Sequence, residues 1–238
     1  MGYRKTPLVN GEFYHIYNRG NSRQQIFFNN DDYRRFIKLL YICNSVKKLN
    51  FRDDIVGRGV DVWDIDRKET IVSIGAWVLM PNHFHLYVIS TKDKDSTKDG
   101  LLGNNITVFM RKLCTAYSKY INVKYKRTGS LFEGRFKSVH MIDDVQAKYL
   151  FSYIHLNPIK LFPKNWKEEG IKDKIKVISF LKKYKWSSYN DYLSEDRVES
   201  RLLDKKSFPD YFRSKKSFQK EIFEWFDIHQ PSQKTVFW

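Results

Sequence analysis

The chain contains few of the residues that would indicate a secreted or membrane-bound protein. Only two of its 238 residues are cysteines, Cys43 and Cys114, so it has neither a disulfide framework nor a CxxC metal knuckle. No apolar run approaches the roughly 20 residues needed to cross a bilayer, and residues 1–7 lack the apolar core of a signal peptide. These absences predict a protein of the reducing cytoplasm with no membrane partner.

Basic and aromatic residues, by contrast, are abundant. The formal net charge is +16, and residues 1–160 carry 26 Lys and Arg against 15 Asp and Glu. An excess of this size predicts a polyanionic partner, bound mostly by the first two thirds of the chain. Aromatic residues make up 16% of the sequence. Aromatics interleaved with basic residues suit stacking on unpaired bases, although most of them belong to the core.

Apolar periodicity predicts a ferredoxin-like α+β fold. Strand patterns occupy residues 13–17, 70–80, 83–90 and 135–142, and helical spacing follows cap sequences at 30–32, 104–105 and 143–144. The order β-α-β-β-α-β-α fits an antiparallel sheet with helices packed on it. Residues 50–69 are predicted to form an irregular excursion, and residues 91–103 a polar loop.

The pattern becomes less regular after residue 160. A helix is predicted around residues 218–226, and Trp186 is expected to serve in packing rather than in base stacking. We therefore expect a catalytic domain over residues 1–160 and a basic, mostly helical accessory segment over residues 161–238.

Two histidines lie one residue apart in the sequence PNHFH at 81–85, within a predicted strand. Since successive strand side chains point to opposite faces, His83 and His85 share one face and Phe84 points to the other. Two adjacent imidazoles form half of a metal site, which still needs a third ligand and an open position. Imidazole ligands favour Mn²⁺ or Zn²⁺ on intrinsic affinity.

A candidate third ligand lies in the predicted helix that Pro158 ends. Tyr153 and Asn157 are one helical turn apart, so Asn157 could complete the metal triad beside the hydroxyl of Tyr153. Tyr149, one turn earlier, is the rival nucleophile. His155 is a weaker candidate ligand, because it points to nearly the opposite side of the helix from Asn157. A metal, a tyrosine and a basic chain together indicate phosphodiester chemistry on nucleic acid.

Three segments in this order resemble the single-tyrosine HUH transposases, the insertion-sequence enzymes and their REP-associated tyrosine transposase relatives. They are MPNHFH at 80–85, GRFK at 134–137 and YIHLNPIK at 153–160. The segments YHIYNRG at 14–20 and WSSY at 186–189 are similar to the REP-associated branch. The resemblance runs from about residue 11 to about residue 193. The Asn at position 157, where many insertion-sequence members have Gln, also matches that branch.

The resemblance implies an HUH endonuclease fold and the cleavage and rejoining of single-stranded or hairpin DNA. It places Mg²⁺ or Mn²⁺ on His83 and His85, with Asn157 as the polar ligand, and the nucleophile at Tyr153. The expected intermediate is a 5′-phosphotyrosine. The alternatives are a domesticated HUH nickase that processes palindromic repeats, and a non-catalytic module that binds single-stranded nucleic acid.

Basic residues near these motifs are candidate DNA contacts. Arg135 and Lys137 are expected to alternate on one strand face near the active helix, and Arg19 follows the first predicted strand. His15 is expected to be structural. The sequence leaves open whether the protein is a monomer or a homodimer.

Overall fold

Four strands form one antiparallel sheet in the order β2-β3-β1-β4. The strands are β1 (Phe13–Arg19), β2 (Val72–Met80), β3 (His83–Ser90) and β4 (Lys137–His140). Helix α1 (Asn30–Cys43) connects β1 to β2, and α2 (Asn105–Lys124) connects β3 to β4. This connectivity and strand order confirm the predicted ferredoxin-like α+β fold.

The structure is a computed structural model. It describes residues 7–47, 49–90, 104–162, 174–193, 196–210 and 214–228. The loop predicted at 91–103 lies outside these residues. No helix in the described part of the chain is long and apolar enough to cross a membrane.

The helices begin at polar side chains that accept hydrogen bonds from the first turn. Asn29 caps α1, one residue before the predicted start, and forms a reciprocal capping box with Asp32. Asn104 caps α2. Asp143 caps α3 (Asp144–Leu156), where its carboxylate accepts a hydrogen bond from the Gln146 N–H at 2.7 Å. These caps fix the residue at which each helix begins.

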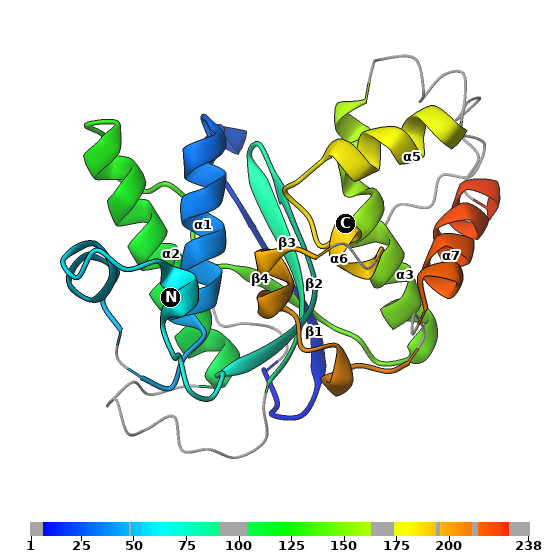
Figure 1. Cartoon of the computed structure of the whole chain (residues 1–238), viewed down its shortest axis with the longest axis horizontal. Coiled ribbons are helices and arrows are strands. Elements are labelled where there is room, and N and C mark those ends of the chain that lie inside the picture. Colours follow the sequence, from blue (N-terminus) through cyan, green and yellow to red (C-terminus); the bar gives the residue numbers. More distant parts are fainter. Residues whose placement is uncertain are drawn as a thin grey trace.

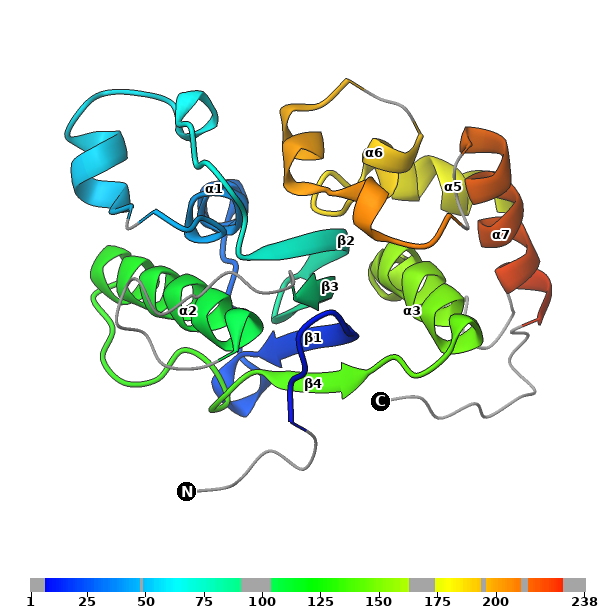
Figure 2. The same ribbon diagram turned by 90° about the horizontal axis from the view of Figure 1, so that it is seen from below.

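Helices cover both faces of the sheet (Figures 1 and 2). Helices α1 and α2 pack on the face that presents Ile16, Phe84 and Leu86, and together they bury the larger apolar cluster. Helix α3 packs on the opposite face, against β2 and β3. Because side chains alternate along each strand, the residues between these apolar positions, including both motif histidines, face α3.

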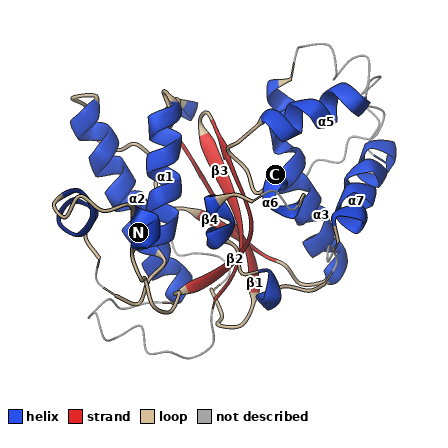
Figure 3. Ribbon diagram, viewed as in Figure 1, coloured by secondary structure: helices blue, strands red, loops and turns tan. Residues whose placement is uncertain are grey.

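The C-terminal helices extend the layer formed by α3 (Figure 3). They are α5 (Lys174–Lys183), α6 (Tyr189–Tyr192) and α7 (Lys215–Ile228), which confirms the helix expected around 218–226. Phe218 of α7 is fully buried among aromatic rings of α3 and α6. The residues beyond 160 thus contribute side chains to the core on the α3 face.

The segment 186–188 forms backbone hydrogen bonds with the outer edge of β2. The Leu79 N–H donates to the Trp186 carbonyl, and the Ser188 N–H donates to the Trp77 carbonyl, each at 2.9 Å. Trp186 stacks on Tyr33 with ring centroids 4.7 Å apart, in agreement with the expected packing role.

Three predicted boundaries are wrong. Strand β1 continues to Arg19 instead of ending at residue 17. Strand β4 spans only Lys137–His140, not 135–142, because Gly134 has a φ of +72° and turns the chain just before it. Arg135 therefore lies in a loop. Strand β2 begins at Val72 instead of residue 70. The excursion at 50–69 contains two short helical turns, Phe51–Val56 and Val62–Asp64.

Candidate active site

The sheet face beneath α3 carries a group of polar and aromatic side chains from the two central strands. In the register of β1 and β3, Tyr17 lies opposite His85, and Arg19 lies opposite His83. His15 is two residues before Tyr17 and therefore shares its face. The backbone register thus gathers these five side chains from segments about 65 residues apart in the sequence.

His85 is held by one ring nitrogen and has the other available. Its Nδ1 lies 2.8 Å from Nε2 of His15, and both imidazoles are buried. Its Nε2 is also buried and has no hydrogen-bond partner among the described residues. Burial lowers the pKa of His85 well below its usual value, and the charges of His15, His83 and Lys160 lower it further. His85 is therefore a neutral imidazole at neutral pH, as metal binding requires.

His83 has a comparable arrangement nearer the surface. Its Nδ1 lies 2.6 Å from the Oδ1 of Asn82, an oxygen that can only accept, so Nδ1 carries the hydrogen and Nε2 keeps its lone pair. Burial and the charge of Lys160 lower the pKa of His83 to about 4, and the neighbouring Asn157 amide partly offsets this lowering. His83 is also neutral at neutral pH.

Asn157 lies where α3 passes into the 3₁₀ turn Asn157–Leu161. It keeps helical backbone angles (φ −52°, ψ −38°), so it remains one turn beyond Tyr153, as the sequence predicts. Its side chain lies near His83, yet within the described part of the chain neither its Oδ1 nor its Nδ2 has a hydrogen bond of normal geometry. The residue is only 2% exposed. A buried amide without partners costs about 1–3 kcal/mol, so a ligand is the natural explanation.

These residues fit a divalent metal. The His83 and His85 Nε2 atoms and the Asn157 Oδ1 are two imidazole donors and one amide oxygen, a set suited to Mn²⁺ and acceptable to Mg²⁺. Across the described ranges, no three or more His, Cys, Asp or Glu side chains gather into a metal cluster. A third protein ligand would therefore come from the asparagine.

Tyr153 projects from α3 onto the histidines. Its ring meets those of His85 and His15 edge-on, with centroids 5.3 Å and 6.2 Å away. The Lys160 Nζ donates a hydrogen bond to the Tyr153 Oη at 3.3 Å and lies 4.8 Å from the centre of the phenol ring. A single ammonium group thus contacts the phenol and acts electrostatically on both imidazoles.

The alternatives to Tyr153 and Asn157 occupy different surroundings. His155 is fully buried in the apolar cluster beneath α3, where Nδ1 lies 2.9 Å from the Phe151 carbonyl and Nε2 lies 2.8 Å from the Ser188 hydroxyl. With both nitrogens engaged, His155 is structural. The ring of Tyr149 stacks 6.3 Å from that of Tyr153, one turn farther from Asn157.

The three basic candidates do not form one group. Arg19 pairs with Glu133, with its Nη2 3.0 Å from Oε1 and its Nε against Oε2. Lys137 lies opposite Tyr17 at the start of β4. The expected alternation of Arg135 and Lys137 along a strand is wrong, since Arg135 precedes the strand. Both line one groove between β4 and α2 instead.

The sequence patterns did not place three residues in this site. His15 was expected to be structural, and Tyr17 and Lys160 received no role. Tyr17 stacks on His15 at 4.8 Å and lies 5.7 Å from His85, and burial and the neighbouring Tyr153 raise its pKa. The alternation of His15 and Tyr17 along β1 is the signal that could have linked these two residues.

The chain matches no protein-family model and no curated protein. Among solved structures it is similar to a REP-associated tyrosine transposase bound to a REP hairpin, at 14% sequence identity and a TM-score of 0.49. The similarity covers 84% of this chain and 90% of that chain.

Proposed function

We propose that this protein is a metal-dependent HUH transposase that cleaves and rejoins single-stranded or hairpin DNA through Tyr153. The observation that carries the proposal is the Tyr153 phenol beside a set of buried, unpartnered donor atoms on His85 and Asn157 in the described structure. The basic chain, the contact of Lys160 with the Tyr153 hydroxyl and the resemblance of the motifs support it.

The reaction is a transesterification at one phosphodiester. The Tyr153 Oη bonds to phosphorus while the bond from phosphorus to the 3′ oxygen breaks. The phenol loses its proton and the leaving 3′ oxygen gains one, giving a 5′-phosphotyrosine and a free 3′-OH. Because the number of phosphoester bonds is unchanged, a new 3′-OH can reverse the step without ATP. This balance is why a nucleophilic tyrosine suits strand transfer better than an activated water would.

The residues around Tyr153 divide the remaining tasks. His83, His85 and Asn157 would hold Mg²⁺ or Mn²⁺, which when bound supplies positive charge to a non-bridging phosphate oxygen. His15 orients His85 through the 2.8 Å contact between their ring nitrogens. Lys160 fixes the position of the Tyr153 oxygen and offsets the charge of the approaching phosphate. Arg19, Arg135 and Lys137 are proposed DNA contacts, and Arg19 would have to leave or share Glu133.

A non-catalytic binding module explains the site less well. Such a module gains nothing from burying donor atoms without partners, since each weakens the fold. A domesticated nickase would use the same residues and the same first step.

The experiment is covalent capture of labelled single-stranded DNA on a denaturing gel. Tyr153→Phe removes only the nucleophilic oxygen, so we expect DNA binding to persist and the protein–DNA adduct to vanish. Tyr149→Phe, the matched control one turn away, should form adduct at the wild-type yield. Undiminished adduct in Tyr153→Phe would reject the assignment. Perfectly paired DNA should bind but remain uncut, because a rigid duplex restricts the in-line geometry that the tyrosine needs.

A further inference from the structure

A groove of about 880 Å³ lies between α2 and the beginning of β4. Figure 2 shows α2 on the same side of the sheet as α1, next to the start of the edge strand β4. One wall comes from α2, where Thr107, Arg111 and Thr115 recur every fourth residue and so share one helix face. The other wall comes from Arg135, Phe136 and Lys137.

The charge of this groove has one sign. Arg111, Arg135 and Lys137 line it, and none of its described lining residues is an aspartate or glutamate, although the chain has 27 of these. Arg111, Arg135 and Lys137 are all exposed. Three cations with threonine hydroxyls between them form a surface that selects an anion with repeated charges.

The groove also reaches the candidate active site. Tyr17 and Asn18, neighbours on β1 whose side chains point to opposite faces of the sheet, both line it. The ring of Tyr17 lies 5.7 Å from that of His85, and Lys137 lies opposite Tyr17 in the sheet. A chain that leaves the histidines past Tyr17 therefore enters the groove directly.

We propose that this groove binds the unpaired DNA strand that flanks the cleaved phosphate, with Arg111 as a phosphate contact. That the bound strand flanks a cleaved phosphate rests on the proposed function. That the groove binds single-stranded DNA does not. Tyr17 and Phe136 are the aromatic surfaces on which unpaired bases stack, and paired bases offer no such face. Arg111 lies on α2, far in sequence from every motif, which is why no sequence pattern indicated it.

The test is equilibrium binding of fluorescein-labelled oligothymidylate, measured by anisotropy over a range of salt concentrations. The Tyr153→Phe protein is used so that no cleavage intervenes. Adding Arg111→Ala should weaken binding about tenfold. It should also reduce the slope of log affinity against log salt by about 0.7, the value for one lost contact on a single strand. Lys119→Ala is the matched control, an exposed cation on α2 that does not line the groove.

Equal affinity and equal salt slope for the Arg111 and Lys119 variants would overturn the proposal. Arg135→Ala tests the opposite wall and should give a loss similar to that of Arg111→Ala; wild-type affinity here would also contradict it. Displacement of the DNA by polyglutamate at equal charge concentration would assign the groove to acidic peptides instead. Thermal unfolding midpoints confirm that each variant is folded.

The two proposals fail separately. If wild-type protein forms no adduct but the Arg111 dependence of binding remains, the groove stands and the transposase assignment falls. If adduct forms normally and Arg111→Ala binds like wild type, only the groove assignment falls.

Discussion

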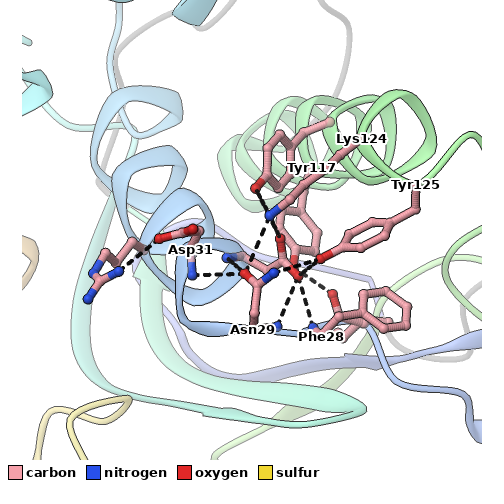
Figure 4. A network of polar contacts seen from close by, with 10 residues as sticks. Phe28, Asn29, Asp31, Tyr117, Lys124 and Tyr125 are labelled. Carbon is pink, nitrogen blue, oxygen red and sulfur yellow. Dashed lines mark hydrogen bonds and ion pairs between the residues drawn. The ribbon is translucent and has the colours of Figure 1, made fainter.

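Two buried polar clusters in this protein differ in how completely their hydrogen bonds are made. One surrounds Asp32 at the start of α1. Figure 4 shows the network of this cluster, in which Asn29 lies near Lys124 and Tyr125 at the end of α2. The other surrounds His85 beneath α3. Both remove charged or polar groups from water, so both need compensating contacts. Among the described residues, the first cluster has them in full and the second has them only in part.

The Asp32 carboxylate accepts five hydrogen bonds from the groups around it. Oδ1 accepts from the Lys124 Nζ at 2.7 Å and the Tyr120 hydroxyl at 3.0 Å. Oδ2 accepts from the Tyr125 hydroxyl at 2.7 Å and from the backbone N–H groups of Phe28 and Asn29 at 2.9 and 3.2 Å. Burial alone would raise the pKa of Asp32, but these donors lower it overall. This cluster joins α1 to α2 and is structural.

In the histidine cluster, by contrast, the hydrogen bonds are incomplete. In the described structure the His85 Nε2 and both polar atoms of Asn157 are buried without hydrogen bonds of normal geometry, while a tyrosine hydroxyl and a lysine lie beside them. Within one fold, the saturated cluster stabilises, and we propose that the unsaturated one reserves atoms for a ligand. The degree of saturation, more than burial or charge, distinguishes the two.

Removing the Asp32 carboxylate from the saturated cluster should have the largest effect, and this effect is on stability. Asp32→Ala leaves Lys124 and two tyrosines without their acceptor, and we expect the free energy of unfolding at neutral pH to fall by about 3 kcal/mol. Urea unfolding measures it. Asp31→Ala is the neighbouring control, because its ion pair with Arg34 is exposed and should contribute about 0.5 kcal/mol or less. Equal losses in the two variants would contradict the structural role.

The stability that Asp32 contributes also depends on pH, in a direction that its pKa decides. Since the folded pKa of Asp32 is lowered, its contribution to stability is complete above the unfolded value, near 4, and is lost as the pH falls through the folded value. The stability difference between wild type and Asp32→Ala should therefore shrink at acidic pH.

Replacing Lys160 should have the next largest effect, and this effect should be confined to the rate of the reaction. Lys160→Met is expected to lower the rate of adduct formation by about 100-fold, the scale of losing one charged donor at a reacting group. Manganese affinity should be unchanged or higher, because a cation that opposes charge at His83 and His85 is removed. Lys160→Arg should recover part of the rate. A parallel loss of manganese binding in Lys160→Met would instead place this lysine in the architecture of the metal site.

Local sequence patterns predicted the parts of this fold and site that local physics decides. Alternation located the central strands, cap residues located the helices, and helical spacing placed Asn157 one turn from Tyr153. The contact of His15 with His85 was not predicted, because the long-range pairing of β1 with β3 brings the two residues together. The contact of Lys160 with Tyr153 was not predicted either, because it depends on the 3₁₀ turn Asn157–Leu161, which brings Lys160 back to Tyr153. The positive φ at Gly134 removed Arg135 from its predicted strand.

The central claim is that the unpartnered atoms of the histidine cluster are metal ligands. Its most direct test is thermal unfolding of wild type and Asn157→Leu, with and without Mn²⁺. Without metal, the variant should be more stable by about 1 kcal/mol, because two buried, unpartnered polar atoms are gone. Mn²⁺ should raise the unfolding midpoint of the wild type, since it binds only the folded state, and leave that of the variant unchanged. Equal stabilisation of both proteins by Mn²⁺ would contradict the claim.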